Sequence, residues 1–133
     1  MLKKEETHTA VIGIGSNIRP EKYIPEAVTL IRKSHRLLAE SRFVQTEPLG
    51  FQDQDDFING AVKIKTYMNF RELNDWLKDT EHRLGRIRTK NKNGPRTIDL
   101  DIVVWDGSVV DALVWEREFL KNAVFEVEPS LIS

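Results

Sequence analysis

Hydrophobic residues recur first at strand spacing and then at helical spacing near the start of the chain. An apolar run over residues 9–15 has the length of a strand and breaks at Gly15-Ser16-Asn17. Proline is tolerated in the first turn of a helix, so we expect the next helix to begin close to Pro25. The apolar residues at helical spacing that predict this helix are Ile24, Ala27, Val28 and Ile31.

The middle of the chain predicts two further strands and a second helix. We expect strands over residues 37–46 and 57–66, separated by a polar loop over 47–56. Asn69 is a capping type of residue and Glu72 follows three positions later, which favours a helix start there. Gly85 is typical of a helix end. The apolar stripe between these two signals consists of Phe70, Leu73, Trp76, Leu77, Thr80 and Leu84.

The last third of the chain contains the clearest strand pattern, over residues 97–105, after a polar loop over 86–96. Asp106 and Gly107 predict a tight hairpin turn into residues 108–110. Beyond them we expect a short helix and then a strand around residues 124–127. The order β-α-β-β-α-β is typical of a ferredoxin-like α+β sandwich, in which both helices cover one face of a largely antiparallel sheet.

Length and composition limit the classes of protein to consider. The 133 residues contain no internal repeat or linker, so we expect a single domain over 1–133 with a polar tail over 1–8. A formal net charge of -1 argues against a generally cationic surface for nucleic acid or membranes. The absence of cysteine excludes disulfides and thiolate nucleophiles. No apolar run approaches the ~20 residues of a membrane span and the start is polar, so a cytoplasmic protein is expected.

Two acidic residues interrupt the clearest strand. Because side chains alternate between the faces of a strand, Asp99 and Asp101 project together, with Cα atoms about 6.6 Å apart at ~3.3 Å per residue. Two carboxylates on one face repel each other unless a positive charge lies between them. Mg²⁺ fills that role and keeps coordination positions open for substrate phosphates. The alternative is a pair that simply faces water on a half-exposed sheet, which is at least as common.

A basic segment precedes this pair and changes the balance between the two interpretations. Residues 83–96 contain no acidic residue and carry Arg83, Arg86, Arg88, Lys90, Lys92 and Arg96. A solvated run of charge is the usual explanation of such a loop. Beside a carboxylate pair, however, a basic loop is what a metal-bound polyphosphate requires. The two features together favour phosphoryl transfer.

The other motifs are less specific. The segment from Gly13 to Asn17 matches neither GxGxxG nor GxxxxGK[ST], so a turn with conformational freedom is the simpler interpretation, and a backbone cradle for a ligand is the alternative. The three histidines, at positions 8, 35 and 82, form no Ser/His/Asp or HExxH arrangement. Hydrolase chemistry and a zinc site are therefore not expected.

Five short motifs occur in order along the chain: GSN at 15–17, TEPLG at 46–50, FIN at 57–59, LGR at 84–86 and GPRTIDLD at 94–101. Taken together they resemble the 6-hydroxymethyl-7,8-dihydropterin pyrophosphokinase family of folate biosynthesis, and the likeness runs from about Thr9 to Leu131. The last motif is by far the most specific. The resemblance implies a ferredoxin-like fold and transfer of the β,γ-diphosphate of ATP to the hydroxymethyl oxygen of a dihydropterin, with release of AMP.

The resemblance also implies roles for individual residues. Asp99 and Asp101 match the ligands of two Mg²⁺ ions and, with Arg86 and Arg96, are the expected catalytic residues. The expected nucleotide-binding residues are Glu81, Arg86, Arg88, Lys92 and Arg117. The expected pterin-binding residues are Thr46, Leu49, Phe57, Asn59 and Phe119. Two phenylalanines suit a flat ring between them and an asparagine suits its amide-like edge, although ordinary core packing would also account for the phenylalanines.

The chain departs from the family pattern at two places. Family members often carry tryptophan directly before Gly-Pro-Arg, where this chain has Asn93. They also carry Pro-His before the residue that matches Arg117, where residues 111–115 fill a shortened stretch and no histidine follows His82. The resemblance also implies a lid over the active site near Asn93, and we expect these changes to weaken ATP binding and closure of this lid more than metal or pterin binding.

Three other functions stay open at this point. The chain can be a divergent homologue acting on a related substrate, or a pterin- or nucleotide-binding protein without turnover. A plain ferredoxin-like interaction module gives no reason for the two aspartates beside a basic loop. No protein partner is indicated by the sequence.

Overall fold

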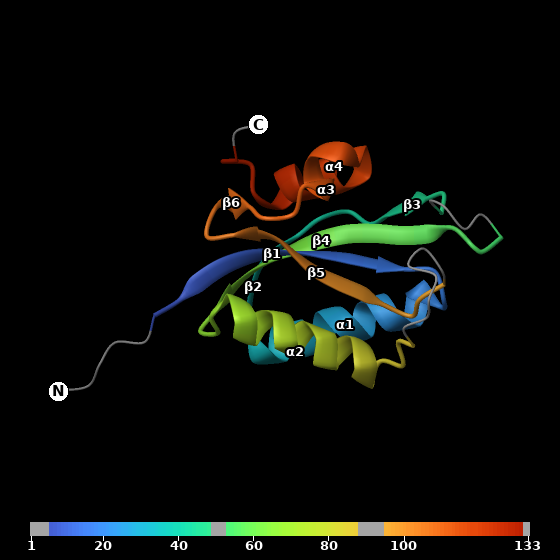
Figure 1. Cartoon of the computed structure of the whole chain (residues 1–133), viewed down its shortest axis with the longest axis horizontal. Helices are drawn as coiled ribbons and strands as arrows, with labels where there is room; N and C mark the ends of the chain where they lie inside the picture. Colours follow the sequence, from blue (N-terminus) through green and yellow to red (C-terminus); the bar gives the residue numbers. More distant parts are fainter. Residues whose placement is uncertain (1–5, 49–52, 88–94, 132–133) are drawn as a thin grey trace.

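The computed structural model describes residues 6–48, 53–87 and 95–131. Six strands form one antiparallel sheet in the order β2-β4-β1-β5-β6, with β3 pairing alongside β4 (Figure 1). The elements are β1 (His8–Ser16), α1 (Pro20–Ser34), β2 (Arg36–Glu40), β3 (Val44–Thr46), β4 (Phe57–Thr66), α2 (Phe70–Arg83), β5 (Asp99–Trp105), β6 (Ser108–Val109), α3 (Leu113–Glu116) and α4 (Glu118–Val127). The expected ferredoxin-like α+β fold is confirmed, with β1-α1-β2-β4-α2-β5 as its β-α-β-β-α-β core.

Helices cover both faces of the sheet. Figure 1 shows α1 and α2 on one face, as expected, and α3 with α4 on the other, which the sequence did not predict. Successive residues of β1 supply the two cores: Ile12 and Ile14 pack toward α1 and α2, and Val11 packs toward α4. A shift in the pairing of β1 with β5 leaves Val103 as an extra residue, so that Val103 and Val104 both join the second core.

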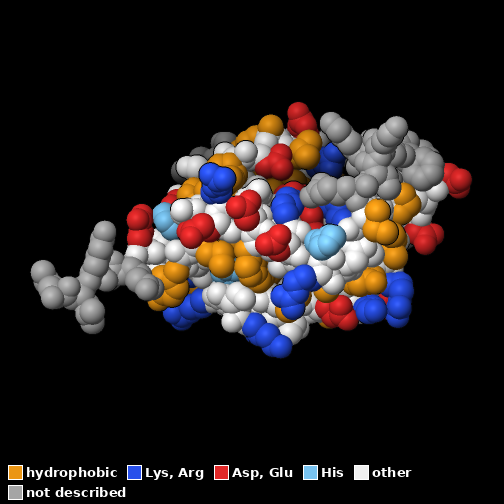
Figure 2. Space-filling model, turned by 60° about the horizontal axis from the view of Figure 1, so that its bottom comes forward, with side chains coloured by type: hydrophobic (Ala, Val, Ile, Leu, Met, Phe, Trp, Pro, Cys, Tyr) orange, Lys and Arg blue, Asp and Glu red, His pale blue; other side chains and the backbone are white. Residues whose placement is uncertain are grey.

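The surface on the side of α1 and α2 carries charges of both signs. On the face that Figure 2 shows, acidic and basic side chains are interspersed around small hydrophobic patches. Within residues 6–48, 53–87 and 95–131, no helix is both long and apolar enough to cross a membrane.

The first helix begins earlier than predicted. The apolar positions are buried as expected, but α1 starts at Pro20, one turn before Pro25, after Arg19 in a left-handed conformation. Pro25 lies inside the helix, where its missing N–H leaves the carbonyl of Glu21 without its usual partner. Both residues are exposed, so water can hydrate this carbonyl, and the interior proline is tolerated.

The single strand predicted over 37–46 is wrong, because it is broken into β2 and β3 at residues 41–43. Ser41 exchanges hydrogen bonds with Ala61, accepting from its N–H on Oγ at 2.8 Å and donating its own N–H at 2.9 Å. Phe43 lies over Gly60, where a Cβ atom would stand 2.5 Å from the phenyl ring. The hydroxyl group of Ser41 and the contact between Phe43 and Gly60 together replace regular strand pairing with β4 between β2 and β3.

The predicted signals at the ends of α2 and in the hairpin are confirmed. Asn69 and Glu72 form a reciprocal capping box at the start of α2, and Gly85 follows its end with φ of 85°. Asp106 and Gly107 both have positive φ, 47° and 83°, which is the backbone of a tight hairpin turn between β5 and β6. The strand before this turn begins at Asp99 and not at residue 97.

The strand predicted around residues 124–127 is wrong, since these residues end helix α4. Ala123, Val124 and Val127 bury one face of this helix against the sheet. A short apolar run with β-branched residues fits a buried helix as well as a strand, and periodicity does not distinguish the two over so few positions.

Candidate active site

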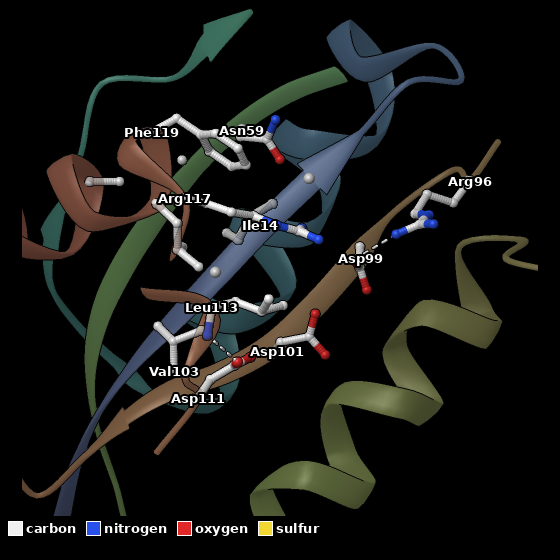
Figure 3. A pocket seen from close by; sticks show the side chains of 15 residues that line it. Ile14, Asn59, Arg96, Asp99, Asp101, Val103, Asp111, Leu113, Arg117 and Phe119 are labelled. Atoms are coloured by element: carbon white, nitrogen blue, oxygen red, sulfur yellow. Dashed lines mark hydrogen bonds and ion pairs between the residues drawn. The ribbon is translucent and has the colours of Figure 1, made fainter. Parts of the chain in front are cut away.

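Asp99 and Asp101 project from the same face of β5, as the alternation predicts. Leu100 and Ile102, between and beyond them, are buried against the α1 and α2 side. The two aspartates instead line a cavity of about 240 Å³ between the sheet and the α3–α4 segment. Figure 3 shows their carboxyl groups next to each other on β5, with the Arg96 side chain reaching Asp99.

The first half of β5 lies at an open edge of the sheet, because β6 pairs only with Val104 and Trp105. Two side chains of α2 satisfy the outward-facing backbone of Leu100 in place of a strand. Its N–H donates to Glu81 Oε2 at 2.7 Å, and its carbonyl accepts from Lys78 Nζ at 2.8 Å. This contact fixes α2 to the strand that carries both aspartates.

Glu81 is a buried carboxylate that contacts two of the cations next to the aspartates. It is 1% exposed, and its Oε2 atom also accepts from Lys78 Nζ at 3.2 Å and from Arg86 Nη1 at 3.3 Å. This one carboxylate thereby binds the backbone of β5 and two cations. Each of these cations also contacts one of the aspartates on β5.

Two arginines bind the carboxylate of Asp99. Arg86 Nη1 lies 2.7 Å from Oδ1 and also donates to the carbonyl of Ile98 at 3.3 Å. Arg96 Nη1 lies 3.1 Å from Oδ2. Burial favours the neutral acid, but the positive charges of Arg86 and Arg96 outweigh it and hold the pKa of Asp99 below its ordinary value.

Asp101 has the opposite electrostatic balance. Burial and then the neighbouring negative charge of Asp99 raise the pKa of Asp101 to about 6, although Lys78 Nζ lies 3.0 Å from its Oδ1 atom. The raised pKa therefore reflects burial and repulsion from Asp99, because the contacting cations equal the local carboxylates in number. A bound cation would relieve this repulsion.

Arg96 is held at the site by Asn17. The Asn17 Oδ1 atom accepts from the backbone N–H of Arg96 at 2.9 Å, and the N–H of Asn17 donates to the carbonyl of Arg96 at 3.2 Å. The Asn17 amide also donates to Gln54 Oε1 at 2.7 Å and to the carbonyl of Asp55 at 3.0 Å. The GSN motif thus joins three segments and places Arg96, whose guanidinium also lies 5.2 Å from the ring centre of Phe57.

Four of the five expected pterin-binding residues line a second cavity, of about 70 Å³: Thr46, Phe57, Asn59 and Phe119. This cavity adjoins the first, since both are lined by Gly15, Asn59, Arg96, Asp99, Arg117 and Phe119. The Asn59 amide donates to Thr46 Oγ1 at 2.6 Å. A Cβ atom at position 15 would lie 2.6 Å from Asn59 Oδ1, so the bare backbone of Gly15 makes room for this amide.

Of the expected nucleotide-binding residues, two lie at the site, one is buried behind it, and two lie outside the described part of the chain. Arg117 lines both cavities, and Arg86 contacts Asp99. Glu81 is buried and lines neither cavity. Arg88, Lys92 and Asn93, with the pterin-side Leu49, lie outside the described residues.

Three residues at the site were missed from the sequence. Lys78 stands three positions before Glu81 on the buried side of α2, and a lysine beside an apolar stripe was an available signal. Asn17 belongs to the GSN motif, but the sequence predicts no role for its side chain. Asp111 lines the larger cavity and accepts from the N–H of Leu113 at 3.0 Å, and no local pattern indicated it.

The donor set fits Mg²⁺ rather than a metal bound by protein groups alone. Among the residues described, no group of three or more His, Cys, Asp or Glu side chains is placed to hold a metal ion. Asp99 and Asp101 supply two neighbouring carboxylates on one face of β5, and the charge of Asp99 repels that of Asp101. Mg²⁺ is commonly bound by one or two carboxylates together with water and substrate phosphates.

Comparison with known proteins adds independent information. Residues 11–129 match the family model described as 7,8-dihydro-6-hydroxymethylpterin-pyrophosphokinase. The Folic acid synthesis protein fol1 of Schizosaccharomyces pombe is 35% identical over 134 residues, which cover 92% of this chain and 18% of that protein. The Bifunctional protein FolKE of Lactococcus lactis is 35% identical over 126 residues, covering 91% of this chain and 36% of that protein.

A third relative is closer in length. The 2-amino-4-hydroxy-6-hydroxymethyldihydropteridine pyrophosphokinase of Haemophilus influenzae is 32% identical over 135 residues, covering 93% of this chain and 84% of that protein. The chain therefore spans most of this relative, but less than two thirds of fol1 and FolKE.

Proposed function

Because the chain belongs to the 7,8-dihydro-6-hydroxymethylpterin-pyrophosphokinase family, we propose that it transfers diphosphate from ATP to the hydroxymethyl group of 6-hydroxymethyl-7,8-dihydropterin. The products are AMP and the pterin diphosphate, as in a step of folate synthesis. The observation that carries the proposal is the position of Asp99 and Asp101 on one face of β5, beside two adjoining cavities.

The smaller cavity suits the pterin. The Asn59 amide can donate to and accept from the amide-like edge of the ring, and Thr46 supports it through a 2.6 Å hydrogen bond. Phe57 and Phe119 line the same cavity and supply flat apolar surface. Asp99 lines this cavity too, so a pterin bound there has its hydroxymethyl group within reach of the carboxylate pair.

The cationic side suits the triphosphate. Arg96 and Arg117 line both cavities, and Arg86 stands behind Asp99. Guanidinium groups recognise phosphate oxygens through pairs of parallel hydrogen bonds. Arg88 and Lys92 complete the proposed nucleotide-binding set, with Glu81 acting by positioning Arg86 and Lys78.

We assign Asp99 and Asp101 as the ligands of Mg²⁺, two ions with ATP bound. When present, Mg²⁺ neutralises phosphate charge and lowers the pKa of the attacking hydroxyl. The protein's own contribution is positioning: Asn59 orients the pterin, and the arginines orient the phosphates in a fixed direction relative to it. We place the reaction in the cytoplasm.

Formation of AMP from ATP and 6-hydroxymethyl-7,8-dihydropterin tests the proposal. We expect Mg²⁺-dependent AMP release that Asp99→Asn or Asp101→Asn lowers by about 10³-fold, since each removes a proposed metal ligand. Asp75→Asn, an exposed change on α2, is the matched control and keeps wild-type activity. Intact pterin binding with no AMP would contradict the proposal and favour a binding protein without turnover.

A further inference from the structure

Lys78 holds its ammonium group in a fixed position at the open edge of β5. Its Nζ atom donates to the carbonyl of Leu100 at 2.8 Å, to Asp101 Oδ1 at 3.0 Å and to Glu81 Oε2 at 3.2 Å. A lysine ammonium has three donors, so these contacts use all of them. The positive charge is therefore tethered beside Asp101 and does not move freely as it would on a surface lysine.

The contact with Asp101 is not needed to attach α2 to the sheet. The Leu100 N–H already donates to Glu81 at 2.7 Å, and Arg86 also binds this glutamate. Lys78 adds a positive charge directly on an oxygen of Asp101. The side chain is 31% exposed, so the arrangement is open to exchange with ions in solution.

This ammonium competes with any divalent cation that Asp101 binds. Two positive charges held on one carboxylate repel each other. Release of Lys78 would relieve the repulsion, but it would leave the Leu100 carbonyl without a donor and Glu81 with less compensating charge. The ammonium of Lys78 therefore lowers the affinity of Asp101 for a free divalent cation. A cation that is already bound to a triphosphate is repelled less, because the phosphates carry negative charge.

We propose that Lys78 is a positioning residue that weakens the binding of free divalent cations at Asp101, so that the cation is taken up together with the nucleotide. The inference rests on the proposed function, because it requires Asp101 to be a metal ligand. According to this inference, Lys78 disfavours binding of the metal before the nucleotide.

Binding of Mn²⁺ without nucleotide tests the inference, with the signal of free Mn²⁺ measured by electron paramagnetic resonance. Mn²⁺ serves as the probe because it accepts the same oxygen ligands. Lys78→Met removes the charge, and Lys78→Gln removes it while keeping a hydrogen-bond donor. Arg71→Met is the control, since it removes one positive charge from an exposed position of the same helix about two turns away.

We expect both Lys78 variants to bind Mn²⁺ about tenfold more tightly than the wild type, and Arg71→Met to stay within about twofold. With a non-hydrolysable ATP analogue present, the advantage of the Lys78 variants should fall to about threefold or less. Unchanged or weaker binding in both Lys78 variants would overturn the inference, as would an equal gain in Arg71→Met. Wild-type affinity in Lys78→Gln alone would also overturn it, because hydrogen bonding and not charge would then be responsible.

Asp101→Asn separates this failure from failure of the proposed function. If this variant loses Mn²⁺ binding in the presence of the analogue while the Lys78 variants behave as wild type, the metal site stands and the role of Lys78 is wrong. If Asp101→Asn binds Mn²⁺ as tightly as the wild type under both conditions, the metal site itself is wrong.

Discussion

Asn59 of β4 and Asp99 of β5 flank the same residue of β1, each pairing in register with Gly15. The proposed pterin-binding amide and the proposed metal ligand therefore lie two strands apart, about 10 Å between backbones at ~4.8 Å per strand. The bare backbone of Gly15 forms the floor between them. If the two residues act as proposed, strand register and not loop conformation sets the distance between the pterin and the metal.

Gly15→Ala tests this relation, because its Cβ would lie 2.6 Å from Asn59 Oδ1 and must displace the amide. We expect pterin affinity, measured by calorimetry, to fall by about tenfold or more, the loss of roughly one well-formed hydrogen bond. Gly13→Ala is the control, since its Cβ meets only ordinary contacts at 3.5 Å and should keep pterin affinity within about twofold. Equal effects of the two changes would contradict the role of Gly15.

Asp101→Asn should stabilise the fold at neutral pH although it lowers activity. The folded pKa of Asp101, about 6, lies above its ordinary value of 3.8. The wild type therefore loses stability as pH rises from about 4 to 6, since the unfolded chain ionises first. Because this side chain is 47% exposed and screened by water, we expect the variant to gain about 1 kcal/mol at pH 7.5.

Urea unfolding without divalent cations, at pH 7.5 and pH 4.5, measures this difference. The gain should shrink to about a third at pH 4.5, where Asp101 is mostly protonated in the folded wild type but still mostly ionised in the unfolded chain. An Asp101→Asn variant that is less stable than the wild type at pH 7.5 would show that the carboxylate is a net stabilising group.

Glu81→Gln should destabilise the fold strongly although the change is nearly isosteric. It removes a buried negative charge that binds Lys78, Arg86 and the N–H of Leu100. We expect a loss of about 3 kcal/mol in the free energy of unfolding at pH 7, because two cations lose their shared partner. Asp79→Asn, at an exposed position of α2, should change stability by less than about 0.5 kcal/mol. A tolerated Glu81→Gln would mean that the glutamate is not the anchor of α2.

Asn17→Ala should impair the nucleotide side of the site through Arg96. The change removes the acceptor of the Arg96 N–H and the donor to Gln54 and Asp55. We expect the KM for ATP to rise by about tenfold in steady-state kinetics, as expected for one misplaced phosphate donor, while Asn122→Ala on the exposed side of α4 leaves it unchanged. A larger rise in the KM for the pterin than in the KM for ATP would contradict this prediction, because Arg96 would then serve pterin binding.

Local periodicity predicted the parts of this molecule that depend on neighbouring residues. Alternation placed Asp99 and Asp101 on one face, and helical spacing identified the buried stripe of α1. For α2 it identified most of the buried stripe, but Phe70, which the pattern also includes, is 42% exposed. The sequence predicts a strand at the end of α4 because the run from Val124 to Val127 fits both a strand and a buried helix. The start of α1 was missed because solvent exposure, which the sequence does not show, makes an interior proline tolerable.

The supporting residues of the site depend on contacts between distant positions. Lys78 reaches Asp101 across 23 positions of sequence, and Asn17 reaches Arg96 across 79. The apolar stripe beside Lys78 and the GSN motif around Asn17 single out these two residues, but neither pattern identifies the distant partner. Only the fold brings these pairs together, so their roles emerge from tertiary structure.

The metal site at Asp99 and Asp101 is the claim on which the rest depends, and a crystal structure with Mn²⁺ and a non-hydrolysable ATP analogue tests it most directly. Anomalous scattering distinguishes Mn²⁺ from water and from Mg²⁺. We predict Mn²⁺ peaks within about 2.3 Å of carboxylate oxygens of both aspartates and in contact with analogue phosphates. Bound analogue with no Mn²⁺ peak at either carboxylate would contradict the account.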